Sequence, residues 1–403
     1  MQTVKYTILK HSTSVNMGVT YGIIPYKMLE AIFYIIYATY ALMLGAASKQ
    51  LIFAVRHFTP PRQTHQKEHQ KELPSVTVCI PARNEVHAMN DCLTSVLASD
   101  YEKMEVIVLD DSSVDDTSTL VKSFAREGVR FVAGKPLPKG WLGKNHALEG
   151  LLKEASGTYV LFLDVDTRLS PRAVSNVMHY AHSEAASMVS IMPRREDGWR
   201  VSVLFSPLRY FWEIMFHRRL APASAGNAWL VSRDELKEYG GFTTLPLTVK
   251  PEAHLAAYFA SHATYRFLVS THEFGVSYEK KWRSQLMTSV RLLYPLLGAQ
   301  WASMIIIVLD LLFILLPVGI LAFGLGLGLD VQHIILSLVL VLGTTLIYGS
   351  YVRRVWARSW WVGSLLWPVK VIQEIILASI SFIQYRRGRV TWKGRPLRSE
   401  AQN

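Results

Sequence analysis

The hydrophobic pattern separates a central stretch of ordinary globular composition from two apolar flanks. Residues 74–279 alternate short apolar runs with polar segments, whereas the flanks contain long runs with few charges. A helix that crosses a bilayer needs about 20 apolar residues, because each residue adds about 1.5 Å along the helix axis. The pattern therefore predicts a soluble domain held between membrane segments.

Short apolar runs within the central stretch predict strands, and the segments between them have the spacing of helices. Strands are expected at residues 75–81, 105–109, 128–132 and 158–163, and helices at 88–98, 117–126 and 143–155. A further helix is expected from Pro171 to about His182, capped by Ser170. Strands and helices that alternate in this way form a parallel, doubly wound sheet with right-handed connections.

The flanks predict membrane helices. Residues 23–47 are apolar, interrupted only by Lys27 and Glu30, and they lack a small-residue cleavage site close to the N-terminus. An uncleaved anchor is therefore favoured over a signal peptide. Residues 303–329 and 331–351 are two further apolar stretches, joined by a glycine-rich turn, and they predict a helical hairpin in the membrane.

A last apolar stretch, residues 360–383, has two interpretations. It contains Pro368, Lys370 and Glu374, and six basic residues follow it between residues 386 and 398. A full span would place these basic residues on the side opposite the soluble domain, against the usual bias of basic loops towards the cytosol. A re-entrant or surface-lying helix pair broken at Pro368 is favoured for that reason, although a fourth span is also long enough.

Composition and charge agree with a membrane location. Half of the 403 residues are hydrophobic, and the net charge is +12. The basic residues gather beside the apolar stretches, at 56–62, 280–291, 353–358 and 386–398. This placement favours anionic lipid over nucleic acid, and no nucleic-acid module is visible. Residues 199–220 mix aromatic and basic side chains, which predicts an amphipathic segment on the bilayer surface. Cys79 and Cys92 are expected to be buried, reduced thiols on a cytosolic face.

The predicted organisation has five parts. They are an N-terminal region with a membrane anchor at 1–57, a linker at 58–73, a central domain at 74–290, C-terminal membrane helices at 301–385 and a basic tail at 386–403.

The strand expected at 158–163 ends in two carboxylates, Asp164 and Asp166. Side chains at positions i and i+2 of an extended segment point to the same side, so both can bind one hard cation, which can in turn hold a diphosphate. Open α/β sheets bind their ligands at the carboxyl ends of their strands. The alternative interpretation is a strand end followed by a solvated turn.

Other polar residues follow the neighbouring predicted strands. Pro81 ends the first strand, and Arg83 and Glu85 follow it. Asp110 and Asp111 follow the second strand. An aspartate at this edge can accept hydrogen bonds from a base or a hydroxyl. The alternatives are a polar turn for the first group and helix capping for the second.

Lys144 begins a predicted helix directly after a glycine. Its ammonium and the free backbone N–H groups of the helix start could both contact a diphosphate. A solvated lysine in the first turn of the helix is the alternative.

Four sequence blocks together carry a family resemblance. They are Ile-Pro-Ala-Arg-Asn-Glu at 80–85, Leu-Asp-Asp-Ser-Ser-Val-Asp-Asp-Thr at 109–117, Gly-Lys-Asn-His-Ala-Leu at 143–148 and Asp-Val-Asp at 164–166. In this order and spacing they resemble the family 2 glycosyltransferases, well over 74–180 and less well over 223–278. The block Gly-Trp-Leu-Gly-Lys at 140–144, the membrane flanks and Trp-Lys-Gly-Arg at 392–395 most resemble membrane glycosyltransferases of carotenoid and hopanoid pathways. Within that group, the chain resembles the 4,4'-diaponeurosporenoate glycosyltransferases.

The resemblance implies a GT-A fold, a Rossmann-like α/β nucleotide-diphospho-sugar transferase domain, for residues 74–290. It implies that Pro81, Arg83 and Glu85 border the uridine pocket, and that Asp111, with Asp110 beside it, reads the uracil or ribose.

For the diphosphate, the resemblance implies binding by Lys144 and Asp164. It also implies that Asp164 and Asp166 hold Mg²⁺ or Mn²⁺ on the donor, which would be a UDP-sugar.

The catalytic base departs from the family pattern. The family has an acidic pair whose second member is the base, and here that pair is replaced by Pro251 and Glu252. Glu252 is therefore the expected base and His254 a second candidate. The Gln-x-x-Arg-Trp motif of processive members is not present in order around Gln285, which disfavours synthesis of a long polysaccharide.

The resemblance implies an inverting transfer from a UDP-sugar to a membrane lipid, by an enzyme of the cell membrane with several spans and a cytosolic catalytic domain. A carboxylate acceptor arrives already ionised, so the altered base favours a lipid carboxylate and a glycosyl ester as product. The resemblance alone implies that this lipid is a carotenoid. The alternatives are a polyprenyl-phosphate or polysaccharide glycosyltransferase, and a catalytically silent accessory membrane protein that retains the nucleotide-binding fold.

Overall fold

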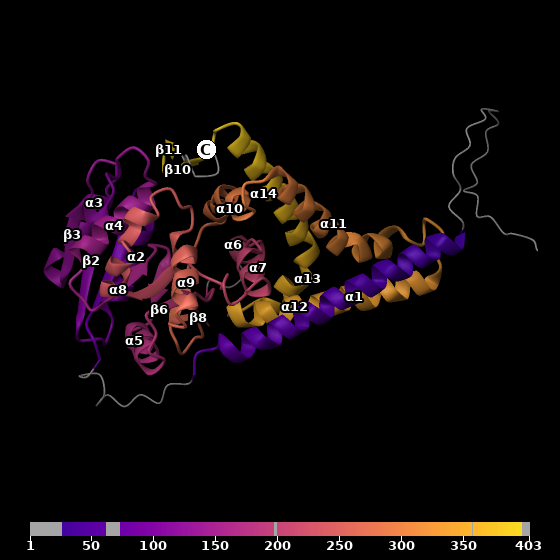
Figure 1. The fold of residues 1–403 in the computed structure, drawn as a ribbon, viewed down its shortest axis with the longest axis horizontal. Coiled ribbons are helices and arrows are strands. Elements are labelled where there is room, and N and C mark those ends of the chain that lie inside the picture. The colour runs from indigo at the N-terminus through magenta and orange to yellow at the C-terminus, as the bar shows by residue number, and fades with distance from the viewer. Residues whose placement is uncertain (1–25, 62–72, 197–199, 357, 397–403) are drawn as a thin grey trace, which may run out of the picture.

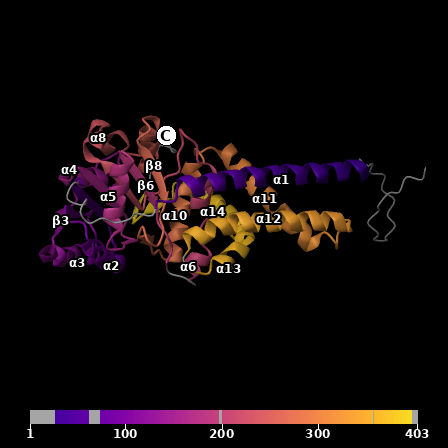
Figure 2. The same cartoon turned by 90° about the horizontal axis from the view of Figure 1, so that it is seen from below.

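The computed structural model describes residues 26–61, 73–196, 200–356 and 358–396. The start of the expected anchor, most of the linker at 58–73 and the last residues of the basic tail lie outside the described residues. An α/β domain forms one end of the molecule, and a bundle of long helices extends away from it (Figures 1 and 2).

A seven-stranded sheet forms the centre of the α/β domain, in the order β3-β2-β1-β4-β7-β6-β8. The strands are β1 (Val76–Ala82), β2 (Met104–Asp110), β3 (Val129–Ala133), β4 (Tyr159–Leu163), β6 (Met188–Met192), β7 (Ala228–Ser232) and β8 (Tyr265–Val269). The expected parallel pairing is confirmed for β1 to β4. The sheet as a whole is mixed, because β7 lies between β4 and β6 and runs antiparallel to both. A small second sheet pairs β5 (Thr167–Leu169) with β9 (Val276–Tyr278).

Helices cover both faces of the sheet, as the doubly wound prediction requires. They are α2 (Val86–Leu97), α3 (Thr117–Ser123), α4 (Gly143–Glu154), α5 (Ala173–Ser183), α8 (Arg233–Glu238) and α9 (Pro251–Ser261), with short 3₁₀ turns η2 (Phe124–Glu127) and η3 (Gly241–Thr244). Successive side chains of β1 point to opposite faces. Cys79 therefore packs in the core beneath α4 and α9, and Val78 in the core beneath α2 and α5. Both cysteines are buried and free, as expected.

The helix α5 begins later than predicted. The expected start at Pro171 with Ser170 as cap is wrong, since the helix begins at Ala173 and no side chain caps it. The backbone N–H of Ala173 donates to the Ser170 carbonyl at 2.9 Å, so a turn precedes the helix.

Among the described residues, three helices are long and apolar enough to cross a membrane: residues 27–57 of α1 (Tyr26–His57), α11 (Trp301–Phe323) and α12 (Val331–Val355). The helix α1 extends beyond the expected end at Ala47, and Leu51 and Ala54 of its last turns are buried in a hydrophobic core shared by the α/β domain and α12. The helices α13 (Trp360–Leu365) and α14 (Trp367–Arg386) are separated next to Pro368, where the sequence predicts a break.

The segment between β6 and β7 joins the two parts of the molecule. The expected amphipathic segment is two short helices from residue 200 onwards, α6 (Val201–Leu204) and α7 (Arg209–Met215), and Trp199 lies outside the described residues. Lys370 of α14 is buried and donates to the Ser206 hydroxyl at 3.4 Å, while Glu374 accepts from the Leu208 N–H at 3.4 Å. Together with α10 (Trp282–Leu296), which packs on α14 and α6, these contacts fix the domain to the helices.

Candidate active site

Asp164 and Asp166 lie directly after β4, at the carboxyl end of the parallel strands. The Asp164 N–H donates to the Asn227 carbonyl at 2.8 Å, and the Thr167 N–H donates to the Asp164 carbonyl at 2.9 Å, so a tight turn holds both aspartates. Their side chains are 29% and 24% exposed, which leaves both carboxylates accessible to a ligand.

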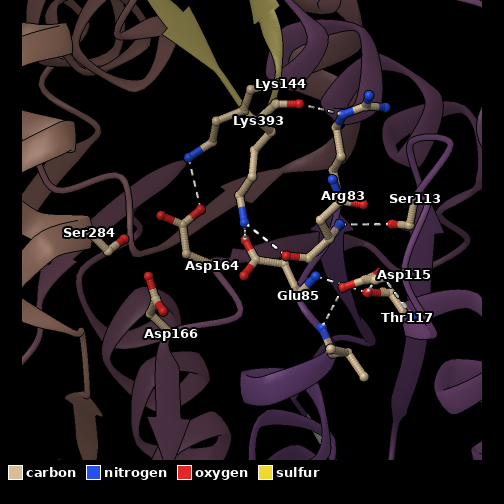
Figure 3. A network of polar contacts seen from close by, with 12 residues as sticks. Arg83, Glu85, Ser113, Asp115, Thr117, Lys144, Asp164, Asp166, Ser284 and Lys393 are labelled. Atoms are coloured by element: carbon tan, nitrogen blue, oxygen red, sulfur yellow. Dashed lines mark hydrogen bonds and ion pairs between the residues drawn. The ribbon is translucent and has the colours of Figure 1, made fainter.

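Each carboxylate faces a lysine. The Lys144 ammonium lies 2.8 Å from Asp164 Oδ1, and the Lys280 ammonium lies 3.1 Å from Asp166 Oδ2 (Figure 3 shows the first pair). The sequence predicts Lys144 at this site, whereas it predicts that Lys280 belongs to a basic cluster at the membrane surface. Two carboxylates and two ammonium groups thus converge at one edge of the sheet, and the ammonium groups can turn from the carboxylates to the oxygens of a diphosphate.

These residues fit a divalent cation. Mg²⁺ is usually held by one or two carboxylates together with substrate phosphates, and Asp164 and Asp166 supply the protein's share of such a ligand set. In the described part of the chain, no three His, Cys, Asp or Glu side chains are grouped to hold a metal alone. A cation here would therefore be shared with the diphosphate.

Two loops beside this site are joined by hydrogen bonds. Pro81 is partly buried near the end of β1. After it, Arg83 donates to the carbonyls of Asp111 and Ser112. The Glu85 N–H donates to the Thr117 hydroxyl at 2.8 Å (Figure 3). Hydrogen bonds therefore connect the two loops that are expected to surround the nucleoside.

Asp110 and Asp111 have different surroundings. Asp110 is buried and accepts hydrogen bonds from the N–H and hydroxyl of Ser113 and from the hydroxyl of Ser118, so it holds its own loop in place. Asp111 instead contacts Arg395, whose guanidinium lies 2.7 Å from its Oδ2. Burial raises the pKa of the Asp111 carboxyl, although Arg395 opposes this shift.

The expected base, Glu252, is buried in the first turn of α9. Its carboxylate lies against Gly226, where an added Cβ would come within 2.6 Å of Oε1. The carbonyl of the next residue, Asn227, accepts a hydrogen bond from the Asp164 N–H. Glu252 therefore contacts the loop that holds the aspartate turn. His254 is exposed, which favours Glu252 over it as the base.

Glu213 was not predicted as a site residue. It forms an ion pair with Lys250, just before α9, and accepts from the Ser224 N–H at 3.3 Å. The only signal in the sequence was a single acid within an aromatic and basic segment.

A pocket opens next to Asp166, between the sheet and the helices α7 and α10. Its lining includes Arg209, Tyr210, Asn227, Tyr278, Lys280 and Gln285. Lys280 belongs both to this pocket and to the ion pair with Asp166. The amide oxygen of Gln285 is buried without a hydrogen-bond partner. The pocket can therefore place a polar group of a second substrate beside the predicted diphosphate site.

Comparison with known proteins shows similarity to glycosyltransferases. Residues 77–238 match the family model described as Glycosyl transferase family 2. Over 112 residues the chain is 34% identical to "Probable glycosyltransferase YdaM" of Bacillus subtilis, covering 27% of this chain and 26% of that protein. Over 113 residues it is 30% identical to "GalNAc(5)-diNAcBac-PP-undecaprenol beta-1,3-glucosyltransferase" of Campylobacter jejuni, covering 27% of this chain and 35% of the relative. The matches thus span about a third or less of these relatives, and the similarity to family 2 glycosyltransferases lies within residues 77–238.

Among solved structures, the mannosyltransferase PcManGT of Pyrobaculum calidifontis, in complex with GDP-Man and Mn²⁺, superposes with a TM-score of 0.52. The alignment covers 89% of this chain and 99% of that chain at 18% identity. The predicted GT-A fold is confirmed: a mixed seven-stranded sheet with helices on both faces, accompanied by apolar C-terminal helices.

Proposed function

We propose that this protein transfers a sugar from a nucleoside diphosphate, UDP in the first instance, to a membrane lipid, with inversion at the anomeric carbon. The observation that carries the proposal is the group formed by Asp164, Asp166, Lys144 and Lys280 next to a pocket walled by α7 and α10. Carboxylates that share a cation with a diphosphate, and ammonium groups that bind its oxygens, are the chemistry that sugar-nucleotide transfer needs.

On the donor side, Lys144 and Lys280 would bind the phosphate oxygens, while Pro81, Arg83, Glu85 and Asp111 would surround the nucleoside. A bound Mg²⁺ or Mn²⁺ would stabilise the charge of the leaving diphosphate. The mannosyltransferase that shares the fold was solved with GDP-Man and Mn²⁺, so both nucleotides belong in any test.

On the acceptor side, the pocket next to Asp166 would receive the polar end of the lipid. Its helices pack against apolar elements, since α7 contacts α1 and α10 contacts α14. A carboxylate oxygen would attack the anomeric carbon as the bond to the diphosphate breaks, with the electron pair leaving on the diphosphate. A carotenoid carboxylate fits this scheme, and the product is a glycosyl ester.

A polyprenyl-linked acceptor is the second candidate, favoured by the undecaprenol named in the Campylobacter jejuni relative. In either case α1, α11 and α12 would span the cell membrane, α13 and α14 would re-enter it, and the catalytic domain would face the cytosol.

The test is transfer of label from radioactive UDP-sugars and GDP-sugars into the lipid extract of membranes that contain the protein. Label should enter lipid with the wild type and not with Asp166→Asn. Release of the label by mild alkali would identify a glycosyl ester, and a stable product would favour an ether or a phosphate-linked acceptor. No transfer from any donor would support the catalytically silent alternative.

Glu252→Gln should lower transfer by less than about tenfold if the acceptor is a carboxylate, because no proton must be removed from it. A general base for an alcohol contributes about a hundredfold or more. The measurement is kcat with the lipid acceptor at several pH values. A loss beyond about a hundredfold would contradict a carboxylate acceptor.

A further inference from the structure

The C-terminal tail returns to the α/β domain as a short β-hairpin. Its strands are β10 (Thr391–Trp392) and β11 (Arg395–Pro396), joined by a turn of two residues. Lys393 and Gly394 in this turn have φ values of 48° and 79°. Two central residues with positive φ are typical of the tight turns that match the twist of a hairpin. Val390, just before it, is buried with Tyr294 and Tyr385, so the hairpin starts from a fixed point beside α14.

The hairpin lies on the loops expected to bind the nucleoside. The Lys393 ammonium is 2.8 Å from Glu85 Oε1 and 3.1 Å from the Asn84 carbonyl oxygen. The Lys393 carbonyl accepts a hydrogen bond from Arg83 Nε at 3.2 Å (Figure 3). Both the side chain and the backbone of Lys393 thus bind the loop that follows β1.

Arg395 of the hairpin covers Asp111, the residue expected to bind the nucleoside. It binds Asp111 Oδ2 at 2.7 Å, and the Asp111 side chain is only 4% exposed. While Arg395 is bound, the Asp111 side chain has little accessible surface left for a base or a ribose hydroxyl. The structure therefore places a cation of the chain itself where the nucleoside is expected.

We propose that the C-terminal hairpin is a plug: Arg395 and Lys393 bind Asp111 and Glu85, and the donor nucleotide must displace them to bind. The proposal rests on the proposed function, because it takes Asp111 as a donor-binding residue. The hairpin follows α14, so a change in the membrane helices can alter access to the donor site.

The expected change in nucleotide affinity follows from the competition between the hairpin and the nucleotide for Asp111 and Glu85. When only a fraction of the protein is competent to bind, the measured dissociation constant exceeds the intrinsic one by the inverse of that fraction. A plug that is open in about a tenth of the molecules would weaken nucleotide binding about tenfold. A variant that opens it permanently should recover that factor.

The experiment compares binding of UDP and of GDP, each with Mg²⁺, to the full chain in detergent by calorimetry. Arg395→Gln and Lys393→Gln should bind one nucleotide about 3- to 10-fold more tightly than the wild type. Arg389→Gln removes an exposed positive charge from the same tail and should bind like the wild type. Hydrogen exchange of residues 390–396 should speed up when the wild type binds the nucleotide, and should already be fast in Arg395→Gln.

The outcomes separate the plug from the donor site. Weaker binding in Arg395→Gln, with slower exchange of the wild-type hairpin on nucleotide addition, would make the hairpin part of the donor site and overturn the plug. Equal affinity in all variants would also overturn it, while leaving the donor site intact. Absence of binding in every variant, including those without the Arg395 contact, would overturn the proposed function itself.

Discussion

Replacing Asp166 with asparagine should lower the rate of sugar transfer by about a thousandfold while the protein stays folded. Asparagine preserves the shape of the side chain but removes the charge that would hold the cation. It also leaves the Lys280 ammonium, now 3.1 Å from the carboxylate, without its ionic partner. Groups that stabilise developing charge are worth about 10²–10³ in rate each, and here a charge and a cation ligand are lost together.

The measurement is the initial rate of label transfer at saturating donor, with the melting temperature as a check on folding. Asp91→Asn is a matched control, because this aspartate is exposed and has only long contacts, at 3.4 Å to the Asn90 amide nitrogen and at 3.8 Å to the Arg168 guanidinium. It should retain the wild-type rate within about twofold. A near wild-type rate for Asp166→Asn would contradict the donor site itself.

The aspartate turn could be predicted because its signals are local. An apolar strand that ends in Asp164 and Asp166 needs only neighbouring residues to define it, and the Thr167 N–H closes the turn on the Asp164 carbonyl. The second bond of the turn, to the Asn227 carbonyl, comes from a distant segment. The same holds for β1 to β4, whose apolar runs and separating helices are visible in the sequence. The reversed direction of β7 could not be predicted in this way, since a short apolar run has no direction until its neighbours in the sheet are known.

The partners of the predicted residues could not be found, because the chain brings them from far away. Arg395 and Asp111 are 284 residues apart, and Arg83 and Lys393 are 310 apart. Lys280 was hidden by composition, since it stands in a basic cluster that a membrane surface explains equally well. No local pattern distinguishes a lysine that faces lipid from one that faces Asp166. The direction of Lys280 depends on how α10 and the end of β9 pack in the folded protein.

Gly226→Ala should lower transfer by about a hundredfold, more than Glu252→Gln does. A Cβ at this position would lie 2.6 Å from Glu252 Oε1 and 2.9 Å from its Cδ, so the buried carboxylate or the loop must move. The loop is not free to move harmlessly, because the Asn227 carbonyl accepts hydrogen bonds from the Asp164 N–H and the Thr167 hydroxyl. A displacement of about 1 Å at a reacting centre can cost about a hundredfold in rate.

The double variant Gly226→Ala with Glu252→Ala tests whether the collision is the cause. Removing the glutamate side chain makes room for the new Cβ, so the double variant should be no slower than Glu252→Ala alone. Gly319→Ala is the control for the substitution itself, since nothing lies within 4 Å of its added Cβ. If Gly226→Ala is no slower than Glu252→Gln, the loop yields without disturbing Asp164, and its position does not limit the reaction. A Gly226→Ala loss that persists unchanged in the double variant would place the damage in the backbone of the loop rather than at Glu252.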